Sequence, residues 1–147
     1  MLKSKNLFKV LIAEDNRDDC AQLVNSLKEI AECTLAVNGE EALKIHQQWQ
    51  KKGKAFDFIL LDVDMPVING FDILKEIRSK EEAFPAGRPA GQAGMKPARI
   101  IMITTYKDSL MENYNLGWDD FITKPVDAKI LIERIQEMGS ATKPLSP

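Results

Sequence analysis

Few residues in this sequence of 147 could build a disulfide framework or a soft metal centre. There are two cysteines, Cys20 and Cys33, and one histidine, His46. The cysteines lack metal-ligand spacing, so we expect reduced, half-buried packing residues and not a disulfide. We expect His46 at the surface of a helix, without a catalytic role. Nothing in this set favours zinc.

Long apolar runs and a dominant charge of either sign are also absent. No stretch is long enough to cross a membrane, and the first residues lack the apolar region of a signal peptide. We therefore expect a cytoplasmic protein without membrane insertion. Twenty basic and 22 acidic side chains give a formal charge of −2, which argues against direct binding of nucleic acid by a broad basic surface.

The patterns that are present alternate between short apolar segments and amphipathic helices. This alternation predicts an α/β fold with a parallel sheet covered on both faces. We expect strands at 9–13, 33–37, 56–61, 100–103 and 121–123. We expect one helix capped by Asn16 and others at 40–51, 71–79, around 109–115, and at 128–138. The strand at 56–61 is unbroken in hydrophobicity, which indicates a central position.

One domain accounts for most of the chain. We place an N-terminal extension at 1–8, the domain at 9–139 and a flexible tail at 140–147. Residues 80–98 hold three prolines and three glycines, which exclude a long helix or strand there. We expect a long solvated loop at these residues, and a role for it in partner contact stays open.

Polar, reactive side chains stand where four of the expected strands end. Glu14 and Asp15 follow the first strand, Asp62 the third, Thr104 the fourth and Lys124 the fifth. The carboxyl ends of parallel strands meet at one edge of an open sheet, so we expect one site. A carboxylate at the end of a buried strand is costly unless such a site uses it.

Three carboxylates in one place repel one another unless a cation is present. An all-oxygen donor set favours a hard divalent ion, and Mg²⁺ suits few protein ligands with several retained waters. A lysine and a hydroxyl beside such an ion fit a phosphoryl group. Asp62 would then be the nucleophile that forms an acyl phosphate.

From residue 9 to residue 138 the chain resembles the receiver domain of two-component response regulators. The matching motifs are Glu14-Asp15, the run from Ile59 to Pro66, Asn69-Gly70, Thr104-Thr105, Asp119-Asp120-Phe121 and Lys124-Pro125. The resemblance implies a flavodoxin-like (βα)5 doubly wound parallel sheet with strand order 2-1-3-4-5. It implies a phosphoprotein of phosphorelay signal transduction.

The resemblance also implies a role for each site residue. Asp62 looks like the phosphoacceptor, Thr104 would bond the phosphoryl group after transfer, and Lys124 would pair with it. Thr104 and Phe121 would form a switch that shifts a two-state equilibrium. The Lys124-Pro125 peptide bond is expected to be cis.

Mg²⁺ is the implied cofactor, and Mn²⁺ could substitute for it. The resemblance implies four residues around the ion: Asp15 and Asp62 directly, Glu14 through water, and Asp64 through its main-chain carbonyl. No organic cofactor is implied.

The implied partners are proteins. A sensor histidine kinase or a histidine phosphotransfer protein would donate the phosphoryl group from a phosphohistidine. A downstream protein partner would read the surface of the last two helices and the fifth strand, and a homodimer through that surface stays open. The domain would catalyse its own phosphorylation and dephosphorylation and would not be a turnover enzyme.

Four features depart from the family pattern. Asp64 adds a carboxylate beside the site, and Trp118 replaces a small residue, where core cover and a partner anchor are both open. The segment from Thr104 to Lys124 is a little short, so the fourth helix could be truncated or irregular. The loop at 80–98 is longer than usual.

Other functions stay open. A haloacid-dehalogenase-like phosphatase also uses an Asp-x-Asp pair, which Asp62-Val63-Asp64 mimics, but here the acidic pair precedes the nucleophile and no cap domain fits. A receiver fragment of a hybrid histidine kinase is a further alternative. A phosphorylation-independent binding module would usually have lost a site residue, and none is missing.

Overall fold

The structure is a computed structural model and describes residues 7–65, 70–82, 97–105 and 117–140. Several expected features lie outside these residues: the helix around 109–115, most of the loop at 80–98 and the tail from residue 141. Within the described part, no helix has the length and apolar character that a membrane span requires.

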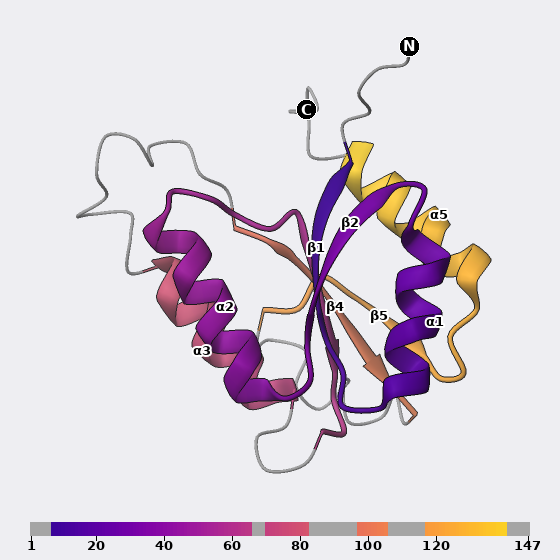
Figure 1. Cartoon of the computed structure of the whole chain (residues 1–147), viewed down its shortest axis with the longest axis horizontal. Helices are drawn as coiled ribbons and strands as arrows, with labels where there is room; N and C mark the ends of the chain where they lie inside the picture. Colours follow the sequence, from indigo (N-terminus) through magenta and orange to yellow (C-terminus); the bar gives the residue numbers. More distant parts are fainter. Residues whose placement is uncertain (1–6, 66–69, 83–96, 106–116, 141–147) are drawn as a thin grey trace.

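Five parallel strands form one sheet in the order β2-β1-β3-β4-β5, which confirms the predicted order (Figure 1). Their bounds are β1 Phe8–Ala13, β2 Ala31–Ala36, β3 Phe58–Asp62, β4 Arg99–Thr104 and β5 Asp120–Thr123. Every residue of β3 is buried, as expected for an apolar strand covered on both faces of a parallel sheet.

Four helices are described, and they lie in pairs on the two faces of the sheet (Figure 1). Their bounds are α1 Arg17–Leu27, α2 Gly39–Lys51, α3 Gly70–Glu82 and α5 Ala128–Ser140. Helices α2 and α3 cover one face, and α1 and α5 cover the other. Asn16 caps α1 as predicted, because its side chain accepts a hydrogen bond from the Asp19 N–H at 2.9 Å.

The prediction for His46 was wrong, because its side chain is buried with 5% of its surface exposed. Ala42, His46 and Gln50 follow one another at four-residue spacing on the buried side of α2. His46 Nε2 lies 3.8 Å from Glu81 Oε2 of α3, and Gln50 donates a hydrogen bond to the Lys80 carbonyl at 3.4 Å. A polar stripe therefore joins α2 to the end of α3.

Some element bounds also differ from prediction. Strand β2 begins at Ala31, two residues earlier than expected, because parallel pairing with β1 extends to Phe8↔Ala31. Helix α3 continues to Glu82, so the first three residues that we expected in the 80–98 loop are helical. The extension of β2 adds the buried Ala31 and the exposed Glu32, whereas the extension of α3 adds only charged residues.

Arg78 binds three segments together near the amino end of the sheet. Its guanidinium donates to the carbonyl of Gly117 at 2.9 Å and of Ala98 at 2.8 Å. It also donates to the carboxylates of Glu81 at 2.7 Å and Asp119 at 2.9 Å. Each carboxylate further accepts a backbone N–H, from Ala98 at 2.9 Å and Ile100 at 2.8 Å respectively. We call Arg78, Glu81, Gly117 and Asp119 the Arg78 clamp.

Candidate functional site

The sheet brings the predicted site residues to one edge. Asp62 is the last residue of β3 and Thr104 the last residue of β4. Glu14 and Asp15 follow β1, and Lys124 follows β5. Strands β1 and β4 both pair with β3, and β5 pairs with β4. The carboxyl ends of these four strands therefore meet, as expected for an open parallel sheet.

Three carboxylates gather at this edge. Carboxylate oxygens of Glu14, Asp15 and Asp62 all lie within 4.8 Å of one another. Glu14 and Asp62 are each 2% exposed, whereas Asp15 is exposed. The cluster thus has two buried carboxyl groups at its base and one at the solvent side.

Lys124 provides the positive charge of the site. Its Nζ donates a hydrogen bond to Asp62 Oδ2 at 3.0 Å and lies 3.8 Å from Glu14 Oε1. Burial alone would lower the pKa of Lys124, but the hydrogen bond to Asp62 and the attraction of both carboxylates raise that pKa above its ordinary value. Lys124 is therefore a fixed cation facing the Asp62 carboxylate.

The backbone around Lys124 is also held in place. The Lys124-Pro125 bond is cis, which confirms the prediction. The Lys124 N–H donates to the Thr104 carbonyl at 2.8 Å. The ends of β4 and β5 are therefore joined at the site.

Glu14 shows that the site has excess negative charge. Burial, together with the hydrogen bond and repulsion from Asp62, raises the pKa of Glu14 to about 8, against the opposing effects of Lys124 and the Asn16 N–H. A divalent cation beside these oxygens would favour the ionised carboxylates. The three oxygen donors therefore fit a hard divalent ion.

The turn after β3 leaves no space for a side chain at residue 70. A Cβ on Gly70 would lie 2.8 Å from both the Asp62 carbonyl oxygen and the Val63 Cα. The Gly70 N–H donates to the Val63 carbonyl at 3.2 Å, and the Asp64 N–H donates to Asp62 Oδ1 at 2.9 Å. The Asn69-Gly70 motif in the sequence indicated a glycine of importance at this position. The steric reason for that glycine comes from the structure. The side chain of Asp64 is exposed.

Thr104 and Phe121 differ in their surroundings. Thr104 is fully buried. Phe121 is half-buried and pairs in register with Met102, two residues before Thr104 in β4. Its ring contacts Trp118 edge to face. The Trp118 ring packs against the core on the α2 and α3 side of the sheet, so it provides core cover.

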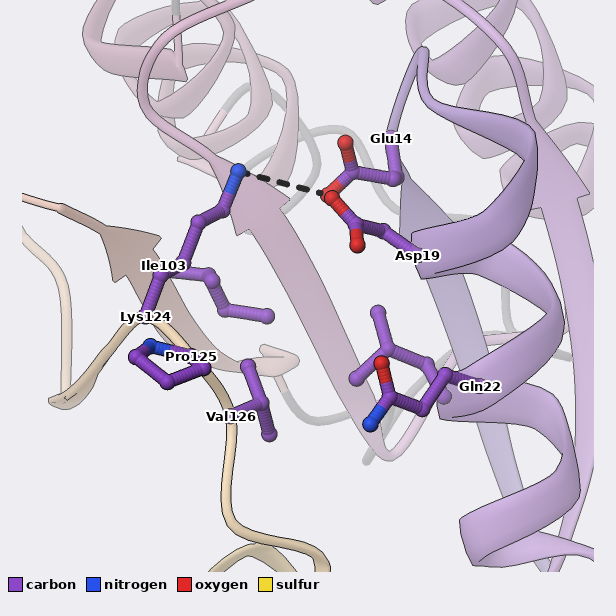
Figure 2. A pocket seen from close by; sticks show the side chains of 8 residues that line it. Glu14, Asp19, Gln22, Ile103, Lys124, Pro125 and Val126 are labelled. Atoms are coloured by element: carbon purple, nitrogen blue, oxygen red, sulfur yellow. Dashed lines mark ion pairs between the residues drawn. The ribbon is translucent and has the colours of Figure 1, made fainter.

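A pocket opens beside the acidic cluster, between α1 and the segment after β5 (Figure 2). Figure 2 shows Lys124 directed across it toward Glu14. Its other lining residues are Asp19, Gln22, Leu23, Ile103, Pro125 and Val126. We did not predict the contribution of Asp19 and Gln22. Their spacing of three on α1 places them on one helix face, which is the signal that could have identified them.

Comparison with known sequences identifies relatives of the whole domain. A family model described as the response regulator receiver domain matches residues 10–136. The chain is 33% identical over 140 residues to hybrid signal transduction histidine kinase L of Dictyostelium discoideum, covering 92% of this chain and 8% of that protein. It is 30% identical over 135 residues to transcriptional regulatory protein CiaR of Streptococcus pneumoniae, covering 90% of this chain and 51% of that protein. The chain thus spans about half of the second relative and a small part of the first.

A solved structure is similar over nearly the full chain. It is the co-crystal structure of the Saccharomyces cerevisiae histidine phosphotransfer protein Ypd1 and the receiver domain of its response regulator Ssk1. The match has a TM-score of 0.76 and 28% identity, and it covers 98% of this chain and 97% of that chain.

Proposed function

The chain belongs to the response regulator receiver domain family, and on this premise we propose that it accepts a phosphoryl group on Asp62 in a Mg²⁺-dependent reaction. The observation that carries the proposal is the setting of the Asp62 carboxylate. It is buried, bonded to Lys124 at 3.0 Å and grouped with two further carboxylates. We propose residues 9–139 as the functional domain.

Asp62 is the nucleophile in this proposal. A carboxylate oxygen forms a bond to phosphorus while the bond from phosphorus to the donor's imidazole nitrogen breaks, and the electron pair of that bond stays with the imidazole. The Asp64 N–H and the Lys124 ammonium orient the carboxylate from its two oxygens. Lys124 then offsets charge on the phosphoryl oxygens, and the Thr104 hydroxyl donates a hydrogen bond to one of them.

The acidic cluster would hold Mg²⁺ or Mn²⁺. We assign Asp15 and Asp62 as direct ligands, Glu14 as a ligand through water and the Asp64 main-chain carbonyl as a further ligand. The bound ion would offset the negative charge of the carboxylates and the incoming phosphoryl group. The raised pKa of Glu14 supports this assignment, because it reflects the excess of negative charge among these side chains.

We propose that phosphorylation changes a protein-binding surface through Thr104 and Phe121. Phe121 lies in β5 beside β4, the strand that ends in Thr104. A shift of Thr104 toward a phosphoryl group would alter the space available to the Phe121 ring. The output surface then includes β5 and α5, which a downstream protein or a second copy of the chain would contact.

The proposed donor is a phosphohistidine on a sensor histidine kinase or a histidine phosphotransfer protein. The similarity to a receiver domain crystallised with a histidine phosphotransfer protein supports this choice. The pocket between α1 and the segment after β5 is lined by Glu14 and Lys124, which lie beside Asp62, and this supports an approach from that side. The similarity to a hybrid kinase keeps a receiver within a longer kinase as an alternative. We propose the cytoplasm as its compartment, which the two free cysteines support.

The test is incubation with acetyl phosphate and Mg²⁺, followed by mass spectrometry of the intact protein and its peptides. Wild type should gain one phosphoryl group on the peptide containing Asp62, and Asp62→Ala should gain none. Asp57→Ala is the matched control, because Asp57 lies just before the same strand and is exposed. Asp64→Ala should still accept the group. Equal incorporation in Asp62→Ala would refute the assignment.

A second assay addresses turnover. We expect essentially no hydrolysis of a small phosphoester such as p-nitrophenyl phosphate, since the proposed reaction leaves the phosphoryl group on the protein. Sustained turnover that depends on Asp62 would instead indicate a phosphatase.

A further inference from the structure

Trp118 and Phe121 form an aromatic pair at the start of β5. Their ring centroids lie 5.9 Å apart at an interplanar angle of 88°, an edge-to-face arrangement. Both rings are half-buried and pack on the core between the sheet and helices α2 and α3. Aromatic pairs prefer this geometry and lose energy when one ring turns away. The orientation of the Phe121 ring is therefore coupled to the position of Trp118.

The backbone on both sides of Trp118 is anchored. Arg78 Nε donates to the Gly117 carbonyl at 2.9 Å, and Arg78 Nη2 donates to the Asp119 carboxylate at 2.9 Å. The Asp119 N–H also donates to the Ile100 carbonyl at 2.8 Å. Trp118 is thus held between α3 and β4 by its two neighbours in sequence.

Gly117 allows this anchorage. Its φ is +108°, a backbone conformation that residues other than glycine rarely adopt. A Cβ at this position would lie 3.2 Å from Arg78 Cγ. The turn can therefore close onto Arg78. Because this turn fixes Trp118, Trp118 does not follow a movement of the Phe121 ring. Such a movement therefore changes the contact between the two rings.

We propose that Trp118 is a positioning residue for Phe121, held in place by the Arg78 clamp, and that it sets how strongly the Phe121 conformation responds to a ligand on Asp62. This inference rests on the proposed function. The edge-to-face contact contributes to the free-energy difference between conformations of Phe121. Ligand affinity at Asp62 is linked to that difference, so it also depends on Trp118.

A core-filling tryptophan would affect only stability, and the chain contains a matched example. Trp49 is also half-buried on the same core, where it stacks on Phe56 with a centroid distance of 3.8 Å. Its aromatic partner, Phe56, lies two residues before β3 and not in β5. Removal of either tryptophan should lower the melting temperature, but only removal of Trp118 should alter binding at Asp62.

The experiment measures the affinity for beryllofluoride, a mimic of a phosphoryl group on a carboxylate, in the presence of Mg²⁺. Titration calorimetry would compare wild type, Trp118→Ala, Phe121→Ala, the double variant and Trp49→Ala. We expect Trp118→Ala to change the apparent Kd by about threefold or more, from the usual energy of an aromatic pair. In the Phe121→Ala background the same substitution should change it by less than twofold. Trp49→Ala should leave the Kd within twofold of wild type.

Trp118→Phe and Trp118→Leu are additional variants for the case that Trp118→Ala fails to fold. Trp118→Phe keeps an aromatic ring, so its Kd for beryllofluoride should stay close to that of wild type. Trp118→Leu should show the same change in Kd as Trp118→Ala. A Kd change below twofold in Trp118→Ala or Trp118→Leu, or a change that persists without Phe121, overturns the role of Trp118. If wild type itself does not bind beryllofluoride, the proposed function fails as well, so the two failures are distinguishable.

Discussion

Two glutamates at opposite ends of the sheet, Glu14 and Glu81, have pKa values that are shifted in opposite directions. Burial and the neighbouring Asp62 raise the pKa of Glu14 at the carboxyl end. Burial also acts to raise the pKa of Glu81 near the amino end, but the contacts with His46, the Ala98 N–H and Arg78 outweigh it and lower that pKa. Donor groups, not burial, decide the difference. Glu81 at the amino end is paired with positively charged and N–H donors of the protein itself, whereas the carboxyl end keeps an excess of carboxylates that, in our proposal, a divalent cation would offset.

The largest expected effect is the removal of the amino-end cation. Arg78→Ala leaves Glu81 and Asp119 without their guanidinium and the Gly117 carbonyl without its donor. We expect a loss of about 3 kcal/mol in the free energy of unfolding, measured by urea denaturation. Arg134→Ala is the control, because Arg134 is 41% exposed and pairs with Asp120; a loss of about 1 kcal/mol is expected there. Equal losses would contradict the contrast between the clamp and an exposed pair.

The two glutamates should respond oppositely to pH when no divalent ion is present. The folded-state pKa of Glu14 is raised from 4.5 to about 8, so Glu14 lowers stability progressively as pH rises through this window. The pKa of Glu81 is lowered, so the stability that Glu81 contributes is present above pH 4.5 and is lost as pH falls below it.

These signs predict that the stabilities of two conservative variants deviate from wild type in opposite directions as pH rises. At pH 8 Glu14→Gln should be more stable than wild type, and Glu81→Gln should be less stable by about 2 kcal/mol. The advantage of Glu14→Gln should disappear toward pH 4.5. Thermal melts at several pH values with a chelator measure both, and parallel profiles would show that the two ends do not differ electrostatically.

Bound Mg²⁺ should reduce the electrostatic difference between the carboxyl and amino ends of the sheet. At a fixed concentration equal to ten times the Kd at pH 8, the ion should stabilise wild type by about 1.4 kcal/mol at that pH. The gain should be larger at pH 8 than at pH 5, because Glu14 must be ionised to assist binding. Asp62→Asn should lose most of the gain, and Arg78→Ala should keep it. Calorimetric melts with and without Mg²⁺ test this, and an equal gain at both pH values would count against the acidic cluster as the binding site.

The smallest effect is expected at an ion pair on the surface. Lys9 Nζ lies 2.5 Å from Glu32 Oε1, but the two side chains are 42% and 59% exposed. Lys9→Met should change the free energy of unfolding by less than about 0.5 kcal/mol. A loss comparable to that of Arg78→Ala would mean that exposure is a poor guide to the strength of ion pairs in this protein.

The carboxyl end was predictable because its signals are local in sequence. Each of Asp62, Thr104 and Lys124 follows an apolar run that predicts a strand, and parallel strands bring their ends together. The strand order and the cis bond before Pro125 were predicted from the family resemblance and are confirmed. The roles of the site residues remain predictions.

The amino end was not predictable by the same reasoning. Arg78 and Asp119 are 41 positions apart, and neither belongs to a local sequence pattern that predicts an ion pair. His46 and Gln50 lie on the buried stripe of α2. The apolar pattern of this helix instead selects Ala42, which is buried, and Leu43, Ile45 and Trp49, which are half-buried. A buried polar side chain depends on partners that only the folded chain supplies.

The buried imidazole between α2 and α3 also has a spectroscopic consequence. His46 is the one histidine of the sequence, so its ring protons give a single set of resonances that needs no assignment by mutagenesis. Those resonances report on the helix pair next to the Arg78 clamp. In protein freed of any polyhistidine tag, one NMR signal could therefore follow the amino end of the sheet while phosphoryl chemistry proceeds at the other.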